Sequence, residues 1–511
     1  MEEERKSERY AARHSIGRTQ SKLGLFFSER TDVEQLNTSL TDYYRCEESL
    51  ARFALSGQPS SGRGFFQFGQ NTVCYGQLSA GRVSNALEGP LEDVAASLPV
   101  NGGTLSLPFD PVQVIENLQR EHYEASLVPG REKLATQEWI RNFYYFVRDV
   151  LPDPVRRSLQ RAYFNDWQNR TFPAWPVDFT VDTIQEKTLK LSMEAAGRQR
   201  VPFVWFWPEG APACLMLTHD VETRVGRDFT SQLMDLDEAH GFKAAFQVIP
   251  EKRYDVSDEY VANIRSRGFE FNIHDLNHDG RLYRRREEFL RRAKKINQYA
   301  HRYDARGFRA GSMYRIQDWY DAYEFSYDMS VPNVAHLEPK RGGCCTVFPY
   351  FVGKILELPL TTCQDYSAFY ILRDYSLELW KKQTQMICER HGLVSLLAHP
   401  DYLIERRPRN AYERLLEYMR RLIGEESLWE ALPGDVDRWW RARSQMKVAA
   451  RGSEWEITGP ESERARLAFA VVRDGELVYE VADKSNRRNE GRPLSAAVVA
   501  ARGNGLADRA V

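Results

Sequence analysis

The sequence predicts an α/β protein whose largest unit is either an α/β barrel or an open, doubly wound sheet. The first observation is an alternation, because seven strand-like runs separated by amphipathic stretches occupy about 230 residues. The second is that several amphipathic stretches close with glycine, which is a helix stop signal. The third is the composition of the 511 residues, 42% hydrophobic and 28% charged, which is typical of a soluble globular chain.

The predicted strands are short apolar runs, and the stretches between them have apolar residues at helical spacing. The strands are ACLMLT (213–218), AAFQVIP (244–250), FEFNI (269–273), GFRAG (307–311), FSYDMS (325–330), ILELPL (355–360) and LVSLLA (393–398). The predicted helices include DFTSQLMDLDEAHG, SDEYVANIRSRG, RREEFLRRAKKINQYAHRY and SLELWKKQTQMICERHG. This α/β unit is expected to span residues 201–445.

The flanking segments have other patterns. Residues 1–60 are rich in Arg, Ser, Glu and Gln and are expected to be a mobile tail, with a short helix near its end. Residues 61–200 predict a β-hairpin at 64–77, a strand at 103–110 and then helices, among them QEWIRNFYYFVRDVL. The Trp- and Pro-rich stretch VPFVWFWPEGAP is expected to pack against the next unit rather than to be a flexible linker. Residues 446–485 predict a small antiparallel β unit, and 486–511 a loose tail.

Charge and cysteine content exclude several classes of protein. A formal net charge of −2 argues against nucleic acid as a partner, because no global basic field attracts a polyanion. No apolar run approaches 18 residues, so no membrane span is expected. The N-terminus lacks the apolar core of a secretory signal, and we expect a cytoplasmic protein. The cysteine number, seven, is odd, and no C-x-x-C pair occurs, so neither a disulfide framework nor a thiolate zinc site is expected.

Polar residues with chemical potential follow the predicted strands. They are His219, Asp220 and Glu222 after the first strand, His274 and His278 after the third, Arg309 in the fourth, Asp328 in the fifth and His399 after the seventh. In α/β barrels the carboxyl ends of the strands form one face, and catalytic residues lie there. We therefore expect these side chains to meet in one cleft.

The spacing His274-x-x-x-His278 indicates a metal site. Two imidazoles four residues apart, with a carboxylate from elsewhere, suit Zn²⁺ or a similar divalent ion and leave positions open for water. Structural interpretations compete with this one. Asp220 could cap a helix, Arg309 could be an ordinary ion-pair partner and the sequence His399-Pro400 could be a strand-end turn. For His219 we favour simple packing in the core.

The motifs quoted above resemble those of the polysaccharide deacetylase family, also called the NodB-homology domain or carbohydrate esterase family 4, over roughly residues 211–445. GFEFNIHDLNH (268–278) resembles the motif G-x-E-x-x-x-H-[ST]-x-x-H, with Asp275 in place of Ser or Thr. THDV (218–221) resembles the family's T-F-D-D, with Val221 where the common pattern has its metal-binding aspartate. In the D-V-E variant the acid is displaced by one place, which makes Glu222 the candidate ligand.

The remaining motifs match less closely. RAG (309–311) keeps the arginine of R-x-P and loses its proline, and Asp328 is a loose candidate for the aspartate of the fourth motif. LVSLLAHP (393–400) matches the fifth motif, an apolar strand that ends in histidine, and it places His399 in the catalytic position.

The resemblance implies a distorted (β/α) barrel of about seven strands and a hydrolase that removes acetyl groups from sugars. It implies a divalent metal, with zinc as the first expectation, held by Glu222, His274 and His278. Asp220 would be the general base, or the ligand in place of Glu222, and Arg309 would orient it.

The resemblance further implies that His399 is the general acid, oriented by Asp328. The implied partner is a carbohydrate, such as a cytoplasmic glycan precursor, and the oligomeric state is left open. Two rivals remain. One is a related amide hydrolase that acts on a non-sugar substrate. The other is a barrel that has lost catalysis and serves as a glycan-binding or assembly module.

Overall fold

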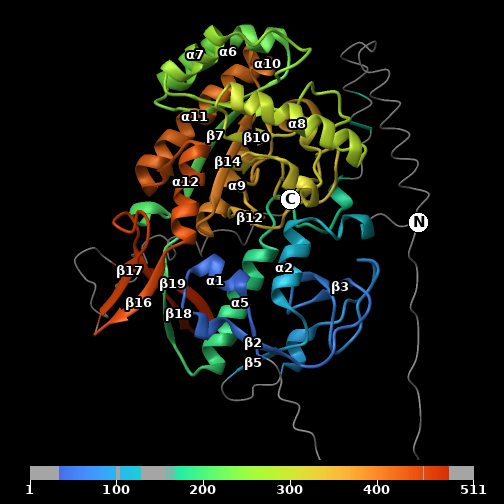
Figure 1. Cartoon of the computed structure of the whole chain (residues 1–511), viewed down its shortest axis with the longest axis vertical. Coiled ribbons are helices and arrows are strands. Elements are labelled where there is room, and N and C mark those ends of the chain that lie inside the picture. The colour runs from blue at the N-terminus through green and yellow to red at the C-terminus, as the bar shows by residue number, and fades with distance from the viewer. Residues whose placement is uncertain are drawn as a thin grey trace, which may run out of the picture.

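A computed structural model describes residues 34–98, 104–127, 167–452 and 454–482, together with residues 158, 161, 162 and 164. A large α/β unit with a central sheet packs against a smaller N-terminal unit, and a β-rich C-terminal unit lies beside both (Figure 1). Residues 1–33 of the predicted N-terminal tail, the predicted helix QEWIRNFYYFVRDVL and the predicted loose tail 486–511 lie outside the described residues.

The central sheet contains all seven predicted strands. They are β7 (Cys214–Val221), β8 (Ala245–Val248), β9 (Glu270–His274), β10 (Gly307–Arg309), β11 (Tyr327–Asp328), β13 (Ile355–Glu357) and β14 (Leu393–Ala398). Two short strands that the sequence did not predict, β12 (Tyr350–Val352) and β15 (Trp429–Glu430), bring the sheet to nine strands. Its order is β12-β13-β11-β10-β9-β8-β7-β14, with β15 paired to the start of β7.

Every strand pair of this sheet is parallel except β12 with β13. All eight residues of β7 are buried. Strands covered on both faces read as continuous apolar runs, and this is why ACLMLT was recognisable in the sequence.

Hydroxyl side chains bridge the open edge of the sheet. The segment after β13 runs beside β14, where Thr361 Oγ1 donates to Leu393 O at 2.7 Å and Thr362 Oγ1 donates to Ser395 O at 2.7 Å. Ser395 N in turn donates to Thr361 Oγ1 at 2.9 Å. These hydrogen bonds link the segment after β13 to the edge strand β14 through side chains, in place of a backbone ladder, in a curled and mostly parallel sheet.

Helices cover the outside of the sheet (Figure 1). They are α6 (Arg224–Ala239), α7 (Asp258–Ser266), α8 (Arg286–Arg302), α9 (Glu378–Glu389), the short α10 (Pro400–Leu403), α11 (Arg406–Glu426) and α12 (Pro433–Ser444). Side-chain caps begin two of them, because Thr223 accepts from Gly226 N and Ser257 accepts from Tyr260 N. A π-helical turn, η8 (Ser367–Leu372), lies between β13 and α9.

Short 3₁₀ turns connect the longer elements of the described part of the chain. They are η1 (Glu48–Ala51), η2 (Val94–Ser97), η3 (Glu124–Ser126), η4 (Trp167–Asn169), η5 (Pro208–Gly210), η6 (Gly311–Met313) and η7 (Gln317–Ala322).

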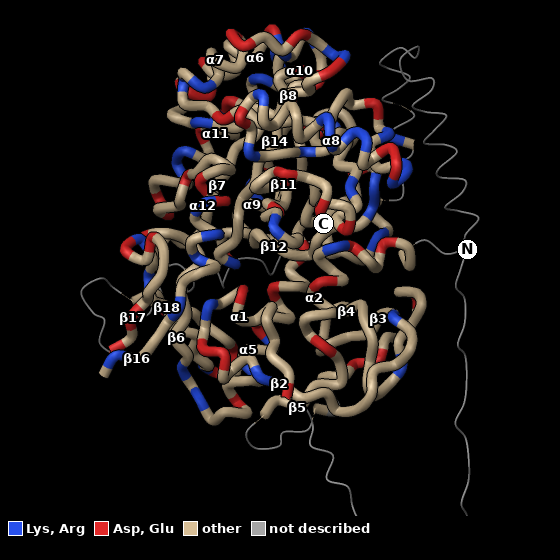
Figure 2. Tube along the Cα trace, in the orientation of Figure 1, with Lys and Arg blue, Asp and Glu red and all other residues tan. Residues whose placement is uncertain are grey.

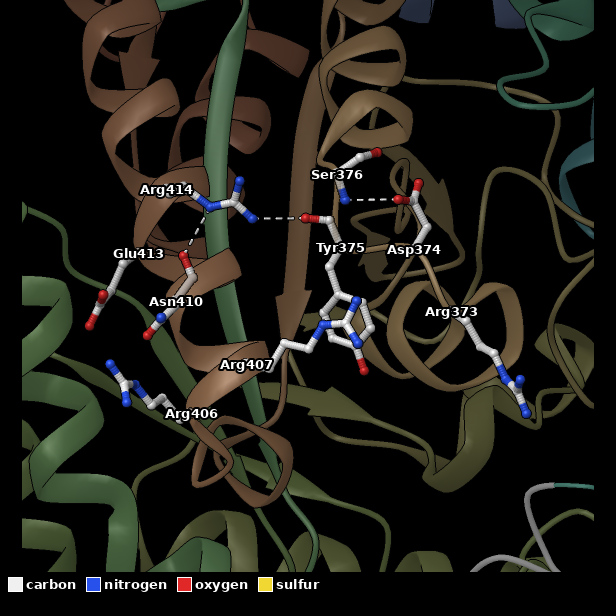
Figure 3. Close-up of a pocket in the computed structure, with 9 residues that line it drawn as sticks. All are labelled: Arg373, Asp374, Tyr375, Ser376, Arg406, Arg407, Asn410, Glu413 and Arg414. Atoms are coloured by element: carbon white, nitrogen blue, oxygen red, sulfur yellow. Dashed lines mark hydrogen bonds between the residues drawn. The ribbon is translucent and has the colours of Figure 1, made fainter.

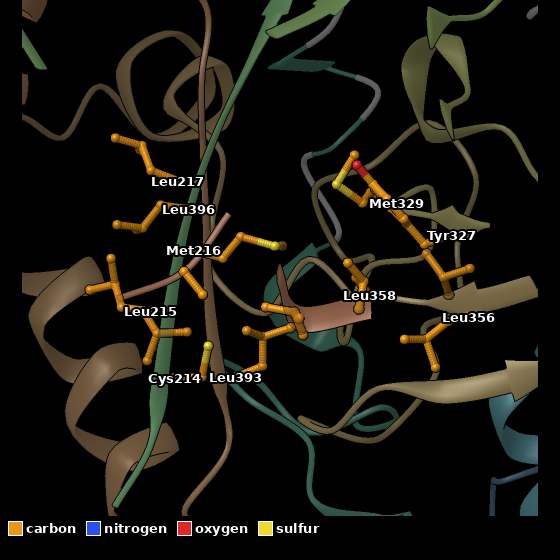
Figure 4. Close-up of a cluster of buried hydrophobic side chains, with 14 of the residues drawn as sticks. Cys214, Leu215, Met216, Leu217, Tyr327, Met329, Leu356, Leu358, Leu393 and Leu396 are labelled. Atoms are coloured by element: carbon orange, nitrogen blue, oxygen red, sulfur yellow. The ribbon is translucent and has the colours of Figure 1, made fainter. Parts of the chain in front are cut away.

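The core of the α/β unit lies between the sheet and these helices and also fills the inside of the curl. Leu215, Leu217 and Leu396 from the paired strands β7 and β14 pack together, and Leu356 and Leu358 belong to the same cluster near β13 (Figure 4). Backbone hydrogen bonds set the spacing of neighbouring strands, and the packed aliphatic side chains hold the sheet against the helices that cover it.

The N-terminal unit corrects one boundary of the predicted tail. Its elements are β1 (Gln35–Leu36), α1 (Thr38–Tyr44), β2 (Arg52–Leu55), β3 (Gly64–Gln67), β4 (Val73–Gly76), β5 (Leu105–Leu107), α2 (Pro111–Gln119) and α5 (Thr180–Ala195). Residues 34–55 belong to the predicted tail but are folded, since Leu40 and Tyr44 are fully buried, and the short helix expected near the end of that tail is α1. The few apolar residues of this polar segment point to one side of α1, which outweighs its polar composition. The β3–β4 hairpin is as predicted.

The C-terminal β unit takes a strand from before the α/β unit. β16 (Lys447–Arg451) pairs with β17 (Glu454–Thr458), while β18 (Leu467–Arg473) pairs with both β19 (Glu476–Val481) and β6 (Arg200–Val204). β6 is the start of the Trp-rich stretch. Trp205 and Trp207 follow it, fully buried, so this stretch packs between units as expected.

Charged residues of both signs are interspersed along the described chain (Figure 2). None of the helices in the described ranges is long and apolar enough to cross a membrane.

A buried ion pair joins the N-terminal unit to the α/β unit. Glu121, just after α2, accepts from Arg315 Nε at 2.8 Å and also contacts Arg315 Nη2, and both side chains are almost completely buried. Gly343 N donates to Glu121 at 2.7 Å. Burial alone would raise the pKa of Glu121, but the Arg315 guanidinium outweighs burial and lowers it.

We expect Glu121→Ala to destabilise the protein by about 3–5 kcal/mol, because it leaves the buried Arg315 charge without its partner. The measurement is the midpoint of chemical unfolding. Glu456→Ala is the matched control, since it removes the carboxylate of the exposed pair with Arg451 and should cost only about 0–1 kcal/mol. Equal effects of the two substitutions would contradict the structural role of Glu121.

Candidate active site

The carboxyl ends of neighbouring strands bring the predicted polar residues together. Asp220 is the second-last residue of β7, His274 is the last residue of β9 and Arg309 is the last residue of β10. Arg309 pairs in register with His274 across the β9–β10 ladder. His399 follows β14 directly, and β14 pairs with β7. The predicted clustering therefore follows from the parallel pairing, which aligns the ends of the strands at one edge.

Glu222, His274 and His278 form a group with the geometry of a metal site. One ligand atom from each lies within 4.8 Å of the others. His278 Nε2 is 3.1 Å from Glu222 Oε1. His274 Nε2 is buried and has no hydrogen-bond partner among the described residues, and the buried His278 Nε2 contacts only the Glu222 carboxylate.

Whether a metal fits this group depends on the Nε2 atoms of His274 and His278. His274 Nδ1 donates to Arg309 O at 3.0 Å, which fixes the tautomer and leaves a lone pair on Nε2 facing the group. Two imidazoles and one carboxylate are a donor set for zinc or a similar divalent ion. Burial would raise the pKa of Glu222, but His278 and the other nearby histidines outweigh it and hold that pKa well below its usual value. The residues present thus fit a divalent metal.

Gly311 makes room for this group. A Cβ at position 311 would lie 2.6 Å from Asp275 Oδ2 and 2.8 Å from His278 Cδ2. His278 itself has a left-handed backbone with φ of 53°, which turns its ring back toward His274. The glycine that replaces the proline of the R-x-P pattern therefore has a steric reason, since the left-handed loop approaches it closely.

Asp220 is held as a carboxylate beside the group. Arg309 Nη1 donates to Asp220 Oδ1 at 2.8 Å and to Thr218 Oγ1 at 3.0 Å, all deep in the structure. Burial would raise the pKa of Asp220, but the Arg309 guanidinium, aided by nearby histidines, outweighs it and lowers the pKa. Asp220 Oδ2 lies 3.7 Å from His274 Nε2. A charged oxygen is thus available next to the candidate ligands.

His399 is held by an aspartate that the sequence reasoning missed. His399 Nδ1 lies 2.6 Å from Asp365 Oδ1, and His399 N donates to Asp365 Oδ2 at 2.8 Å. Burial would lower the pKa of His399, but the Asp365 carboxylate and then Glu222 and Asp220 raise it to about 10. His399 Nε2 lies 4.0 Å from Glu222 Oε1, so the His399 ring faces the candidate metal group.

Asp328 was expected to orient His399 and is placed differently. Its carboxylate accepts from Tyr320 Oη at 2.9 Å and from Ser330 N and Oγ at 2.9 Å each. Burial raises the pKa of Asp328 and of its neighbour Glu357. Asp365 occupies the orienting position instead. In the sequence, Asp365 is marked only by its place at the end of TTCQD, which follows the predicted strand 355–360. Its proximity to His399 arises only in the folded protein.

Asp401 is a second residue that the sequence did not single out. Its carboxylate accepts from Glu222 N at 3.0 Å and from Thr223 N at 2.9 Å. It therefore ties the loop that carries Glu222 to the segment that carries His399. Gly226 packs on this contact, since a Cβ there would lie 2.3 Å from Asp401 Oδ2.

His219 is a core residue, as expected from packing. It is fully buried, with Nδ1 3.1 Å from Ala398 O and Nε2 2.9 Å from Asp237 Oδ2. It therefore turns away from the candidate metal group and links β7 to α6.

Comparison with known proteins finds similarity among solved structures only. No family model matches the sequence, and no curated protein matches it. A structure named "putative polysaccharide deacetylase" from Mycobacterium smegmatis is similar, with 15% identity, a TM-score of 0.39, and coverage of 48% of this chain and 96% of that one.

Two other similar structures have different activities. The allantoinase Puue has 14% identity and a TM-score of 0.35, with 46% of this chain and 92% of that one covered. A CE4 family pseudoenzyme from Bacillus anthracis has 12% identity and a TM-score of 0.26, with 44% and 65% covered.

We expect the purified protein to contain about one equivalent of zinc or a similar divalent metal, because the donor set of Glu222, His274 and His278 is complete. His274→Ala should lose this metal, as measured by elemental analysis of the purified protein. His301→Ala is the control, since His301 lies on α8 with an exposed side chain paired to Glu324. Wild-type protein that carries no metal and binds none on titration would refute the site.

Proposed function

We propose that the protein is a metal-dependent hydrolase that removes an acetyl group from an N-acetylated sugar or glycan precursor. The observation that carries the proposal is a combination of groups in one place. Three side chains could bind a metal, one carboxylate can accept a proton and one imidazolium can donate one. Asp220 lies beside His274 as a carboxylate, and His399 lies beside Glu222 as an imidazolium. Amide hydrolysis needs both a group that accepts a proton and a group that donates one.

The metal would be held by Glu222, His274 and His278, and zinc is the ion that this donor set favours. When bound, such an ion supplies a Lewis acid that polarises a carbonyl and lowers the pKa of water. The second carboxylate, Asp220, is engaged by Arg309 and is therefore better placed as a base than as a ligand. We assign the displaced acid of the D-V-E motif, Glu222, as the ligand on this ground.

Asp220 accepts the proton of the attacking water. Its free oxygen, Oδ2, faces His274, while Oδ1 is occupied by Arg309 Nη1. The guanidinium keeps Asp220 ionised down to a pH below the usual range of an aspartate, because it lowers the pKa of that carboxyl. Arg309 thus acts through Asp220 and is a positioning residue.

His399 donates its Nε2 proton to the leaving nitrogen as the C–N bond breaks. The products are acetate and the free amine, and the proton taken by Asp220 balances the one given by His399. Asp365 holds His399 Nδ1, so that Nε2 faces the group that contains Glu222. The raised pKa of His399 keeps it protonated at neutral pH, as a general acid requires.

The discriminating experiment is a screen for acetate release. The substrates are acetylated chito-oligosaccharides, acetylated nucleotide sugars and a set of small non-sugar amides, each with the metal-loaded protein. Acetate from a sugar substrate supports the proposal, whereas hydrolysis of non-sugar amides alone would favour the related amide hydrolase. Glycan binding without any hydrolysis would favour the non-catalytic module.

Asp220→Asn should lower kcat/KM by about 10²–10⁴-fold, the range for loss of a general base, while metal content stays near one equivalent. Acetate release and metal analysis on the same preparation measure the two effects. Asp321→Asn is the control, because Asp321 is an exposed partner of Arg286 and should leave kcat/KM unchanged. Full activity in Asp220→Asn would rule out the assignment of the base.

Asp365→Asn should move the alkaline limb of the pH profile of kcat/KM to lower pH. The Asp365 carboxylate is the largest cause that raises the pKa of His399, so its removal lowers that pKa. A general acid works only while it is protonated, and the variant therefore loses activity at a lower pH than the wild type. A profile that is scaled down without shifting would show that Asp365 has only a structural role.

A further inference from the structure

A cavity rich in arginine lies outside the candidate active site and takes no part in the proposed reaction. It has a volume of about 1000 Å³ and is formed by the segment after η8 and the first two turns of α11. Its arginines are Arg373, Arg406, Arg407 and Arg414 (Figure 3). Tyr375 supplies the one aromatic surface of its lining.

The charges around this cavity are not balanced. Four arginines face two carboxylates, Asp374 and Glu413, which leaves two positive charges in excess. Asp374 is already engaged, because its Oδ1 accepts from Ser376 N at 2.8 Å. Within the described part of the chain, no carboxylate forms an ion pair with Arg373, Arg406 or Arg407.

The start of α11 adds to this positive field. Arg406 and Arg407 stand in the first turn of a helix of 21 residues, and that turn contains no acidic residue. The N-terminus of a helix is the positive end of its dipole, so cationic side chains there are unfavourable without an anion. The residue before the helix, Glu405, does not cap it with its side chain and instead accepts from Tyr370 Oη at 3.4 Å.

Two of the arginines are held in place by neighbouring groups. The Arg407 guanidinium lies over the Tyr375 ring, 4.0 Å from its centroid (Figure 3). Arg414 Nη2 donates to Tyr375 O at 2.8 Å, and Arg414 Nε donates to Asn410 O at 3.3 Å. A guanidinium fixed on an aromatic ring keeps its edge free for two parallel hydrogen bonds to an oxyanion.

The segments that line the cavity are close in sequence to those that carry His399 and its partner Asp365. η8 separates Asp365, the partner of His399, from Arg373, and α10 separates His399 from Arg406. Tyr402 of α10 contacts the His399 ring, with centroids 5.0 Å apart, and also the ring of Tyr370, at 5.1 Å. These ring contacts connect the segment that carries His399 to the segment that leads into the cavity.

We propose that this cavity is a binding site for a phosphate-bearing anion, specifically a diphosphate group. Two excess positive charges match the two negative charges of a diphosphate that is esterified at both ends, and the polar lining disfavours an apolar ligand. The diphosphate could be part of the acetylated sugar substrate or a separate ligand, and in the first case the proposal also rests on the proposed deacetylase function. The site itself is tested by binding, independently of any activity.

The probe for the site is inorganic pyrophosphate, titrated into the full-length protein by calorimetry. We expect the double variant Arg406→Ala/Arg407→Ala to bind at least tenfold more weakly than the wild type. Arg421→Ala is the matched control, since Arg421 is an exposed arginine farther along α11 and outside the cavity. Its affinity should equal that of the wild type, and an unchanged melting temperature would show that both variants fold.

Pyrophosphate also chelates metals, and the His274→Ala variant separates the two modes of binding. Affinity that persists in His274→Ala and falls in the arginine variant places the ligand in the arginine cavity. No binding to the wild type, equal weakening by Arg421→Ala, or loss of binding in His274→Ala with full binding in the arginine variant would each overturn the proposal.

The source of the diphosphate is distinguished by kinetics. Acetate release is compared between an acetylated nucleoside diphosphate sugar and the same acetylated sugar without its diphosphate. If the group belongs to the substrate, the arginine variant raises KM at least tenfold for the first substrate and leaves the second unchanged. Equal KM values for the two substrates, with pyrophosphate binding intact, indicate a separate ligand. Absence of acetate release from both would refute the proposed function while leaving the binding result valid.

Discussion

The candidate active site depends on one residue, Arg309, which connects three strands of the sheet. Its guanidinium donates to Asp220 and Thr218 of β7 and to Met329 O just after β11. Its backbone carbonyl accepts from His274 Nδ1, at the end of β9. Because Arg309 is fully buried, its charge has to be compensated inside the protein, and the carboxylate of Asp220 provides that compensation. The same residue therefore fixes the tautomer of a candidate ligand and the charge of the candidate base.

The candidate active site contains an ionised carboxyl group, Asp220, and a protonated imidazole, His399. The residues around each group explain its protonation state. Asp220 stays ionised because a guanidinium outweighs the effect of burial on its pKa. His399 stays protonated because the carboxylate of Asp365 outweighs the opposite effect of burial. Each catalytic candidate therefore has a charged partner of its own: Arg309 pairs with Asp220, and Asp365 pairs with His399. Pairs of groups whose pKa values are pushed apart are the usual arrangement for acid and base catalysis.

The loops at the strand ends are shaped as closely as the strands. Asp401 holds two backbone amides of the loop that carries Glu222, and glycines at 226 and 311 leave space where a larger residue would clash. This arrangement explains in physical terms why the D-V-E motif and Gly311 differ from the common motifs. The D-V-E sequence places Asp220 against Arg309 and leaves Glu222 beyond the strand, where Asp401 orients it toward His278. The arginine cavity is formed by the segments that follow η8 and α10, and a diphosphate bound there would add a second recognition site to the protein.

The sequence by itself determined the α/β class, the seven main strands and the residues at their ends, because buried parallel strands are continuous apolar runs and catalytic groups follow them. It also indicated Glu222, His274, His278, Asp220, Arg309 and His399, since each lies at or near the end of a strand or within a recognisable spacing. Only the tertiary structure decided that Asp365, not Asp328, holds His399. Asp365 and His399 are 34 positions apart in the sequence and meet only through the fold. It likewise decided that residues 34–55 are folded and that β6 joins β18, since both depend on packing between segments distant in the chain. Local patterns specify elements and their ends, whereas the partner of each side chain is specified by contacts that no local pattern contains.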